Sequence, residues 1–291
     1  MVIRYSKDPQ VDRTLRHSVR DGVAYSVMSG GGETYFSAFA LFLKATAPQI
    51  ALLATLPPLL GSLAQLLAVW LGAQLLRRLP VILAGATLQA LVLVPLVILP
   101  LVHRDQAVHI LVACVTLYYA GANLATPLWI SLMGDLVPER KRGRFFGRRT
   151  RLATMTAFVS LVAAGLVLHQ FDAAGWTVFG FAAIFLIAAV ARGVSVYHLS
   201  RMREPVEAHA PHPQPAQRIS LRLLRHSHAR RFTLFLAAMQ GATAVAAPFF
   251  FRLHAARPAV QLSPIHGQYR HGGAGAVSYP EYLGADQRRV R

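Results

Sequence analysis

The chain has 291 residues, of which 54% are apolar and only 14% are charged. A soluble domain carries about 25% charged residues, so this chain has too few of them to cover a water-facing surface. Lys and Arg nevertheless outnumber Asp and Glu by 30 to 12, as expected of a multi-span membrane protein whose basic residues gather on one side. The composition excludes a disordered chain, a disulfide-rich secreted module and a collagen-like fibre.

Seven segments are long and apolar enough to cross a bilayer core about 30 Å thick, which needs roughly 20 residues per helix. A charged leader over residues 1–22 precedes them and is too long for a signal peptide, so we expect the first span to stay as an anchor. The predicted fold is all-α: a six-helix bundle over 23–197, a linker over 198–230 with a basic amphipathic helix, and a seventh span. The expected spans are 23–43, 49–75, 80–102, 108–133, 152–170, 175–197 and 231–251.

Glu33 lies in the middle of the first span, directly after three glycines, Gly30 to Gly32. A carboxylate at membrane depth is costly and usually faces a cavity or a partner. The glycines let another helix approach closely or let this helix bend. We predict that Glu33 couples transport to a proton or cation, or contacts substrate; a structural pairing with a neighbouring helix is the alternative. Other polar span residues are candidates either for a central cavity or for interhelical hydrogen bonds: Tyr35, Gln65, Tyr118, Tyr119, Asn123 and Gln240.

The basic residues predict the orientation of the chain. Of the 30 Lys and Arg residues, 22 lie in the leader, the turn after the second span, the loop after the fourth, and residues 192–231. The opposite turns hold only Lys44 and Arg104. This asymmetry predicts a multi-pass protein of the plasma (inner) membrane with a cytoplasmic N-terminus. The charge is spread over several loops rather than gathered on one patch, which argues against a nucleic-acid partner.

Neither a metal site nor a catalytic site is evident in the sequence. Four histidines of the linker region, His209, His212, His226 and His228, match no familiar zinc spacing. Cys114 is the single cysteine, so no internal disulfide is possible. We find no Ser/His/Asp triad, paired acids or phosphate loop. We therefore expect no enzyme and no cofactor, with the lipid bilayer and a small solute as partners.

Residues 129–151 carry a recognisable loop pattern: Gly134-Asp135, then Pro138-Glu139-Arg140, then Arg142-Gly143-Arg144, with Gly147 after it. This pattern resembles the cytoplasmic 4–5 loop of transporters of the major facilitator superfamily. The resemblance implies two six-helix bundles with substrate bound between them at mid-membrane, and ion pairs that close a cytoplasmic gate. An ordinary positive-inside loop is the alternative. The predicted gate residues are Gly72, Arg77, Asp135, Glu139, Arg142, Gly143, Arg144 and Gly147.

The turn after the second span departs from the family pattern. The family motif Gly-x-x-x-Asp-Arg-x-Gly-Arg fits this chain at Gly72 and Arg77, but Leu76 replaces the Asp and Leu79 the second Gly. The usual gate chemistry of this turn is therefore not expected in full.

Residues 252–291 differ from the rest of the chain, with six arginines on the side that the charge rule leaves poor in cations. We predict that a shifted reading frame produced this tail; a genuine short tail is the alternative. Resequencing codons 247–253 distinguishes the two. The predicted function is transport of a small solute by alternating access, in a truncated chain with impaired or no activity. The alternatives are a half-size carrier acting as a homodimer and a non-transporting membrane interaction or signalling protein.

Overall fold

A computed structural model describes residues 5–204, except residues 7, 75–76 and 103–105, and a few positions between 230 and 242. The chain divides into two units, residues 1–213 and 214–291, and the first is the subject below. The described positions between 230 and 242 are helical. Most of the predicted linker and seventh span, with Gln240, and the whole predicted tail lie outside the described residues and stay predictions.

Every element that the structure describes is a helix, which confirms the all-α prediction. Five of the helices, α3 to α7, are long and apolar enough to cross a membrane, and all five overlap the predicted spans. The elements are α1 (Pro9–Gly31), η1 (Glu33–Tyr35), α2 (Phe36–Phe42), α3 (Ala47–Gln74), α4 (Leu79–Val102), α5 (Ala107–Leu136), η2 (Glu139–Lys141), α6 (Arg142–Ala173) and α7 (Thr177–Ser200).

The first helix begins at Pro9, inside the segment predicted as a leader. Asp8 accepts a hydrogen bond from the Gln10 N–H at 2.8 Å, and Pro9 occupies the first helical position, which together start a helix. Burial alone would raise the pKa of Asp12, but the N–H groups of Tyr5 and Ser6 and the Arg16 guanidinium lower it below its usual value. Residues 9–22 therefore form part of the bundle.

Gly30 to Gly32 end α1 and allow helices α6 and α7 to approach it closely. A Cβ on Gly30 would collide with the backbone of Ala157 on α6, and one on Gly32 would lie 2.6 Å from the Cβ of Ala188 on α7. After Gly31 the chain makes one 3₁₀ turn and continues as α2. Both effects expected of the glycines, close approach and bending, are present.

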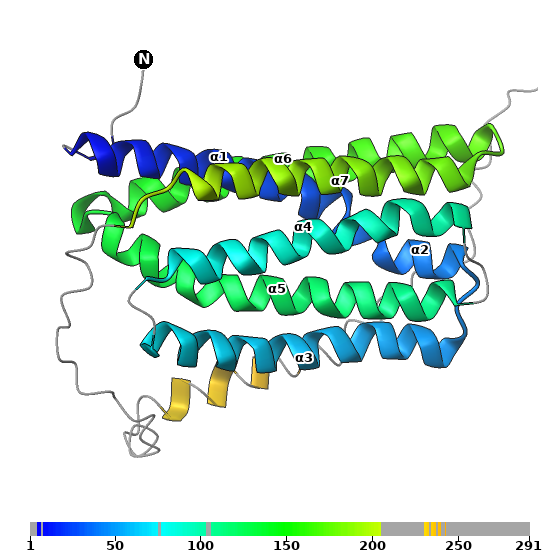
Figure 1. Cartoon of the computed structure of the whole chain (residues 1–291), viewed down its shortest axis with the longest axis horizontal. Helices are drawn as coiled ribbons and strands as arrows, with labels where there is room; N and C mark the ends of the chain where they lie inside the picture. The colour runs from blue at the N-terminus through cyan, green and yellow to red at the C-terminus, as the bar shows by residue number, and fades with distance from the viewer. Residues whose placement is uncertain are drawn as a thin grey trace, which may run out of the picture. The chain divides into compact units, whose positions relative to one another are not determined.

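The long helices run side by side and pack in two groups (Figure 1). Helices α1, α6 and α7 pack together, helices α3 and α4 pack on α5, and α4 packs against α7 to join the groups. The starts of α1, α4 and α6 and the ends of α3, α5 and α7 meet at one end. We call it the basic end; it carries residues 77–79, 137–142 and 201–204.

Two apolar clusters fill the bundle, one toward each end. The cluster away from the basic end includes Met28, Phe39, Leu93, Tyr118 and Phe185. The cluster near the basic end includes Leu15, Ile82, Leu132, Phe145 and Leu199. On α1, α4 and α7, buried polar residues lie between the positions that belong to the two clusters: Asp21, Gln89, Arg192 and Ser195.

Helices α4 and α5 are in backbone contact, which gives a test of their packing. A Cβ on Gly121 would lie 2.6 Å from the Gly85 carbonyl oxygen, whereas one on Gly134 of the same helix meets nothing within 4 Å. We expect Gly121→Ala to lower the unfolding temperature in detergent, because the two backbones must separate. Gly134→Ala is the matched control and should be neutral or slightly stabilising. Equal unfolding temperatures for both variants, measured by size exclusion after heating, would contradict this packing.

Candidate functional site

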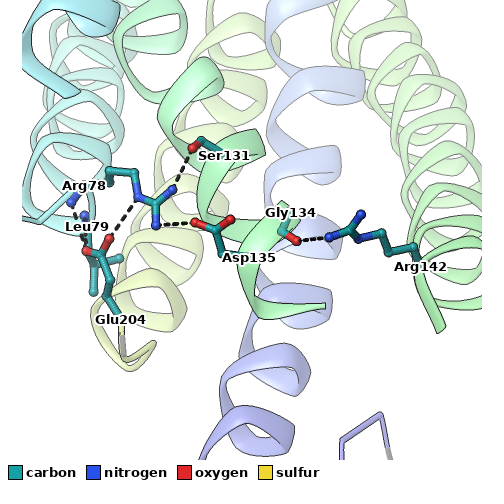
Figure 2. Close-up of polar contacts among 7 residues, drawn as sticks. All are labelled: Arg78, Leu79, Ser131, Gly134, Asp135, Arg142 and Glu204. Atoms are coloured by element: carbon teal, nitrogen blue, oxygen red, sulfur yellow. Dashed lines mark hydrogen bonds and ion pairs between the residues drawn. The ribbon is translucent and has the colours of Figure 1, made fainter. Parts of the chain in front are cut away.

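Arg78 is the centre of a polar cluster at the basic end (Figure 2). The residue precedes α4, and only 8% of its surface is exposed. Its guanidinium lies 2.7 Å from an Asp135 carboxylate oxygen on α5 and 3.0 Å from Glu204, which follows α7. The Ser131 hydroxyl oxygen accepts a third bond at 2.6 Å. One cation thus joins three helices.

Glu204 also caps α4. Its Oε2 accepts hydrogen bonds from the backbone N–H groups of Arg78 and Leu79, at 2.9 and 3.1 Å. A carboxylate at a helix N-terminus satisfies unpaired N–H groups and interacts favourably with the helix dipole. The segment after α7 is therefore bound to the first turn of α4.

The predicted gate residues are only partly brought together. Asp135 belongs to the cluster, but its partner is Arg78, whereas the predicted Arg77 is exposed. Arg142 donates to the Gly134 carbonyl at 2.7 Å (Figure 2). Its ion pair with Glu139 is 3.6 Å long and Glu139 is 85% exposed, so this pair contributes little.

The remaining predicted gate positions lie outside the cluster. Gly72 packs against α5, where a Cβ would lie 2.5 Å from a Leu128 methyl carbon. A Cβ on Gly143 or on Gly147 would meet nothing within 4 Å, and Arg144 is exposed. These four residues therefore make no contact with Arg78 that the structure shows.

Glu33 is held by two adjacent tyrosines of α5. Its carboxylate oxygens accept hydrogen bonds from the Tyr118 hydroxyl at 2.8 Å and the Tyr119 hydroxyl at 2.9 Å. Glu33 is half-buried and Tyr118 is 1% exposed. Asn123, one turn further along α5, donates to the Tyr119 carbonyl at 2.9 Å. Four of the predicted cavity residues, Glu33, Tyr118, Tyr119 and Asn123, thus lie in one group of contacts.

Two other predicted cavity residues lie elsewhere. The Tyr35 hydroxyl donates to the Leu161 carbonyl on α6 at 3.0 Å, away from α5. Gln65 is exposed on α3.

A buried chain of hydrogen bonds links α1, α7 and α4 between the two apolar clusters. The Ser195 hydroxyl donates to Asp21 at 2.6 Å and accepts from Arg192 at 2.6 Å. Arg192 in turn donates to the Gln89 side-chain oxygen at 2.5 Å. None of these four residues is more than 4% exposed. The chain of bonds fixes the three helices at one level of the bundle.

Arg149 of α6 completes this polar layer. Its guanidinium lies 3.7 Å from Asp21 and 4.1 Å from the centre of the Trp129 ring, a cation–π distance. Arg149, Arg192, Asp21, Gln89 and Trp129 line one cavity of about 290 Å³. Within the residues that the structure describes, no group of three or more His, Cys, Asp or Glu side chains is arranged to hold a metal ion.

The polar layer corrects an expectation drawn from the charge pattern. That pattern places Asp21 in the leader and counts Arg149 and Arg192 as cytoplasmic cations, but Asp21 and Arg192 are buried and Arg149 lines the same cavity. Asp21 and Arg149 lie just outside the predicted spans, but α1 and α6 extend beyond those spans and include both residues. One signal is present in the sequence: Arg192 falls within the predicted span 175–197, and an ionisable residue inside a span is by default a candidate functional residue.

A family model for the Major Facilitator Superfamily matches residues 22–279. The chain belongs to this superfamily. The match confirms the resemblance found in the 4–5 loop and makes the chain a multi-pass membrane protein of a transporter family, whose members are generally not enzymes. It covers the bundle of this superfamily protein from residue 22 onward and extends into the segment predicted as a tail. Searches of curated proteins and of solved structures returned no match.

The Arg78 cluster predicts a large stability difference between two adjacent arginines. We expect Arg78→Met to lower the free energy of unfolding by about 3–5 kcal/mol, because it removes the guanidinium from a buried ion pair with Glu204. Arg77→Met is the matched control and should change it by less than about 0.5 kcal/mol, because Arg77 is exposed. Denaturation of both variants in detergent measures the difference; similar losses would show that the cluster contributes no stability.

Proposed function

We propose that this superfamily chain carries a small solute across the membrane by alternating access, with Glu33 as its proton- or cation-coupling residue. The contacts of Glu33 carry the proposal. Its carboxylate lies beside two tyrosine hydroxyls, and within residues 5–204 no Lys or Arg forms an ion pair with it. An ionisable side chain inside a membrane-spanning bundle is by default a candidate functional residue. A helix break directly precedes Glu33.

The Arg78 cluster supports a gate at the basic end. Alternating access requires contacts that close one end of the protein and then separate. Asp135 is 49% exposed on its side chain, so one partner of Arg78 reaches the surface of the bundle. We propose that this end faces the cytoplasm across the plasma (inner) membrane, with Arg78 and Glu204 added to the predicted gate residues.

Alternating access also sets a requirement for a second bundle. Transporters of this kind rock two bundles around a central site, and residues 5–204 form one. We propose that the chain alone has impaired or no transport activity and that pairing with a second bundle restores it. A second copy of the chain is the simplest partner.

Coupling through Glu33 is tested by proton flux. The chain, and a tandem fusion of two copies, are reconstituted into liposomes that contain a pH-sensitive dye, and a panel of small solutes is applied outside. We expect Glu33→Gln to reduce solute-driven proton flux at least tenfold, because the amide cannot exchange a proton. Asp172→Asn is the control, since Asp172 is an exposed acid that belongs to neither the gate nor the Glu33 contacts.

Each outcome of this assay has a defined meaning. Flux in the tandem fusion but not in the single chain supports the need for a second bundle. Flux that survives Glu33→Gln rules out coupling through this residue. An absence of flux from both forms contradicts transport by a pair of these chains.

A further inference from the structure

We propose that the cavity of the polar layer binds an oxyanion, a carboxylate or phosphate group carried by a small ligand. The cavity is lined by Arg149, Arg192, Gln89 and Trp129, together with Asp21. If the ligand is the transported solute, the inference rests on the proposed function; the binding itself does not.

Three unused hydrogen-bond donors carry this inference. The Gln89 side-chain amide nitrogen, the Trp129 indole nitrogen and the Arg192 Nε are buried and have no hydrogen-bond partner in the described part of the chain. All three residues line the same cavity. Gln89 is 0% and Arg192 is 4% exposed. Buried donors are normally paired, and leaving one unpaired is costly. What the cavity lacks is an acceptor.

The charges of the cavity indicate that the acceptor is negative. Arg149 and Arg192 contribute two positive charges, and Asp21 is the single acid among the lining residues. The Asp21 carboxylate already accepts from Ser195 and pairs with Arg149. Glu33 does not compensate the second guanidinium by contact, because its two oxygens are bonded to tyrosines.

An excess positive charge inside an apolar bundle is costly unless it is paired. A water molecule would satisfy the donors but leave the charge uncompensated. A carboxylate or phosphate satisfies both requirements, and the planar guanidinium group suits the geometry of either.

The size and apolar lining of the cavity limit the ligand. Its volume of about 290 Å³ is at the lower end of small-molecule sites. Ile82, Ala125 and Ile130 form part of the wall. These features favour a small organic anion: one oxyanion group on a short apolar body.

Trp129 provides a local fluorescence reporter for a binding test. The chain has three tryptophans, and the other two, Trp70 and Trp176, are 58% and 63% exposed. The double variant Trp70→Phe/Trp176→Phe leaves Trp129 as the single tryptophan. This full-length chain is purified in detergent and titrated with butyrate, with inorganic phosphate and with butyramide, which has the shape of butyrate without its charge.

We expect a saturable change in Trp129 fluorescence with butyrate, phosphate or both, and at least tenfold weaker binding of butyramide. Binding of butyrate alone assigns the site to a carboxylate, and binding of phosphate alone to a phosphate group. Equal binding of butyrate and butyramide, or no saturation with any probe in a chain that elutes as a folded peak, would overturn the proposal.

A charge-changing variant sharpens the test. Gln89→Glu keeps the oxygen that accepts from Arg192 but adds a negative charge, so anion affinity should fall at least tenfold. Arg151→Gln is the control, because Arg151 is exposed and does not line the cavity. Unchanged affinity in a folded Gln89→Glu chain would also overturn the proposal. If that variant does not fold, the butyrate and butyramide comparison decides.

Binding and transport fail separately in this design. If the chain binds butyrate but moves no solute in liposomes, the anion site is supported and the proposed transport function is contradicted. If the chain shows coupled flux but no anion binding, the proposed function is supported and the anion site is contradicted.

Discussion

A buried guanidinium, a partly buried one and a buried carboxylate determine how this bundle is organised. Arg149, Arg192 and Asp21 come from α6, α7 and α1, and charges in an apolar interior are tolerated only where partners meet them. Ser195 and Gln89 extend the contacts from α1 through α7 to α4. The relative heights of these helices are therefore set by polar contacts, and the apolar clusters on either side exclude water and strengthen them.

The polar layer and the Arg78 cluster share the helices α4 and α7. Gln89 and Arg192 meet within the bundle, and Arg78 and Glu204 meet where α4 begins and after α7 ends. A helix transmits displacement along its length because its backbone hydrogen bonds keep it stiff. Separating Arg78 from Glu204 by moving α4 against α7 would thus strain the contact between Gln89 and Arg192. Ligand occupancy of the cavity and opening at the basic end are expected to influence each other through this pair of helices.

Several site features can be predicted from the sequence because they depend on local pattern. Glu33 stands out by its depth in an apolar segment, and it does meet Tyr118 and Tyr119. The partner of Asp135 is harder to predict. The family motif places its arginine at Arg77, whereas the structure pairs Asp135 with the neighbouring Arg78. The difference arises from Glu204, 126 residues away, which caps α4 at Arg78 and draws that side chain into the bundle.

The all-helical fold, the membrane class and the family can be predicted from the sequence alone, because hydropathy and loop motifs are read over neighbouring residues. Which charges are buried, and what they contact, follows from the packing of the helices. Asp21 and Ser195 are 174 residues apart in the chain, yet their side chains are hydrogen-bonded. No local pattern records such a pairing, because it depends on which helices pack together and at what height. The basic residues that make the chain strongly positive therefore lie in two places: most are on the loops, and a few are within the bundle.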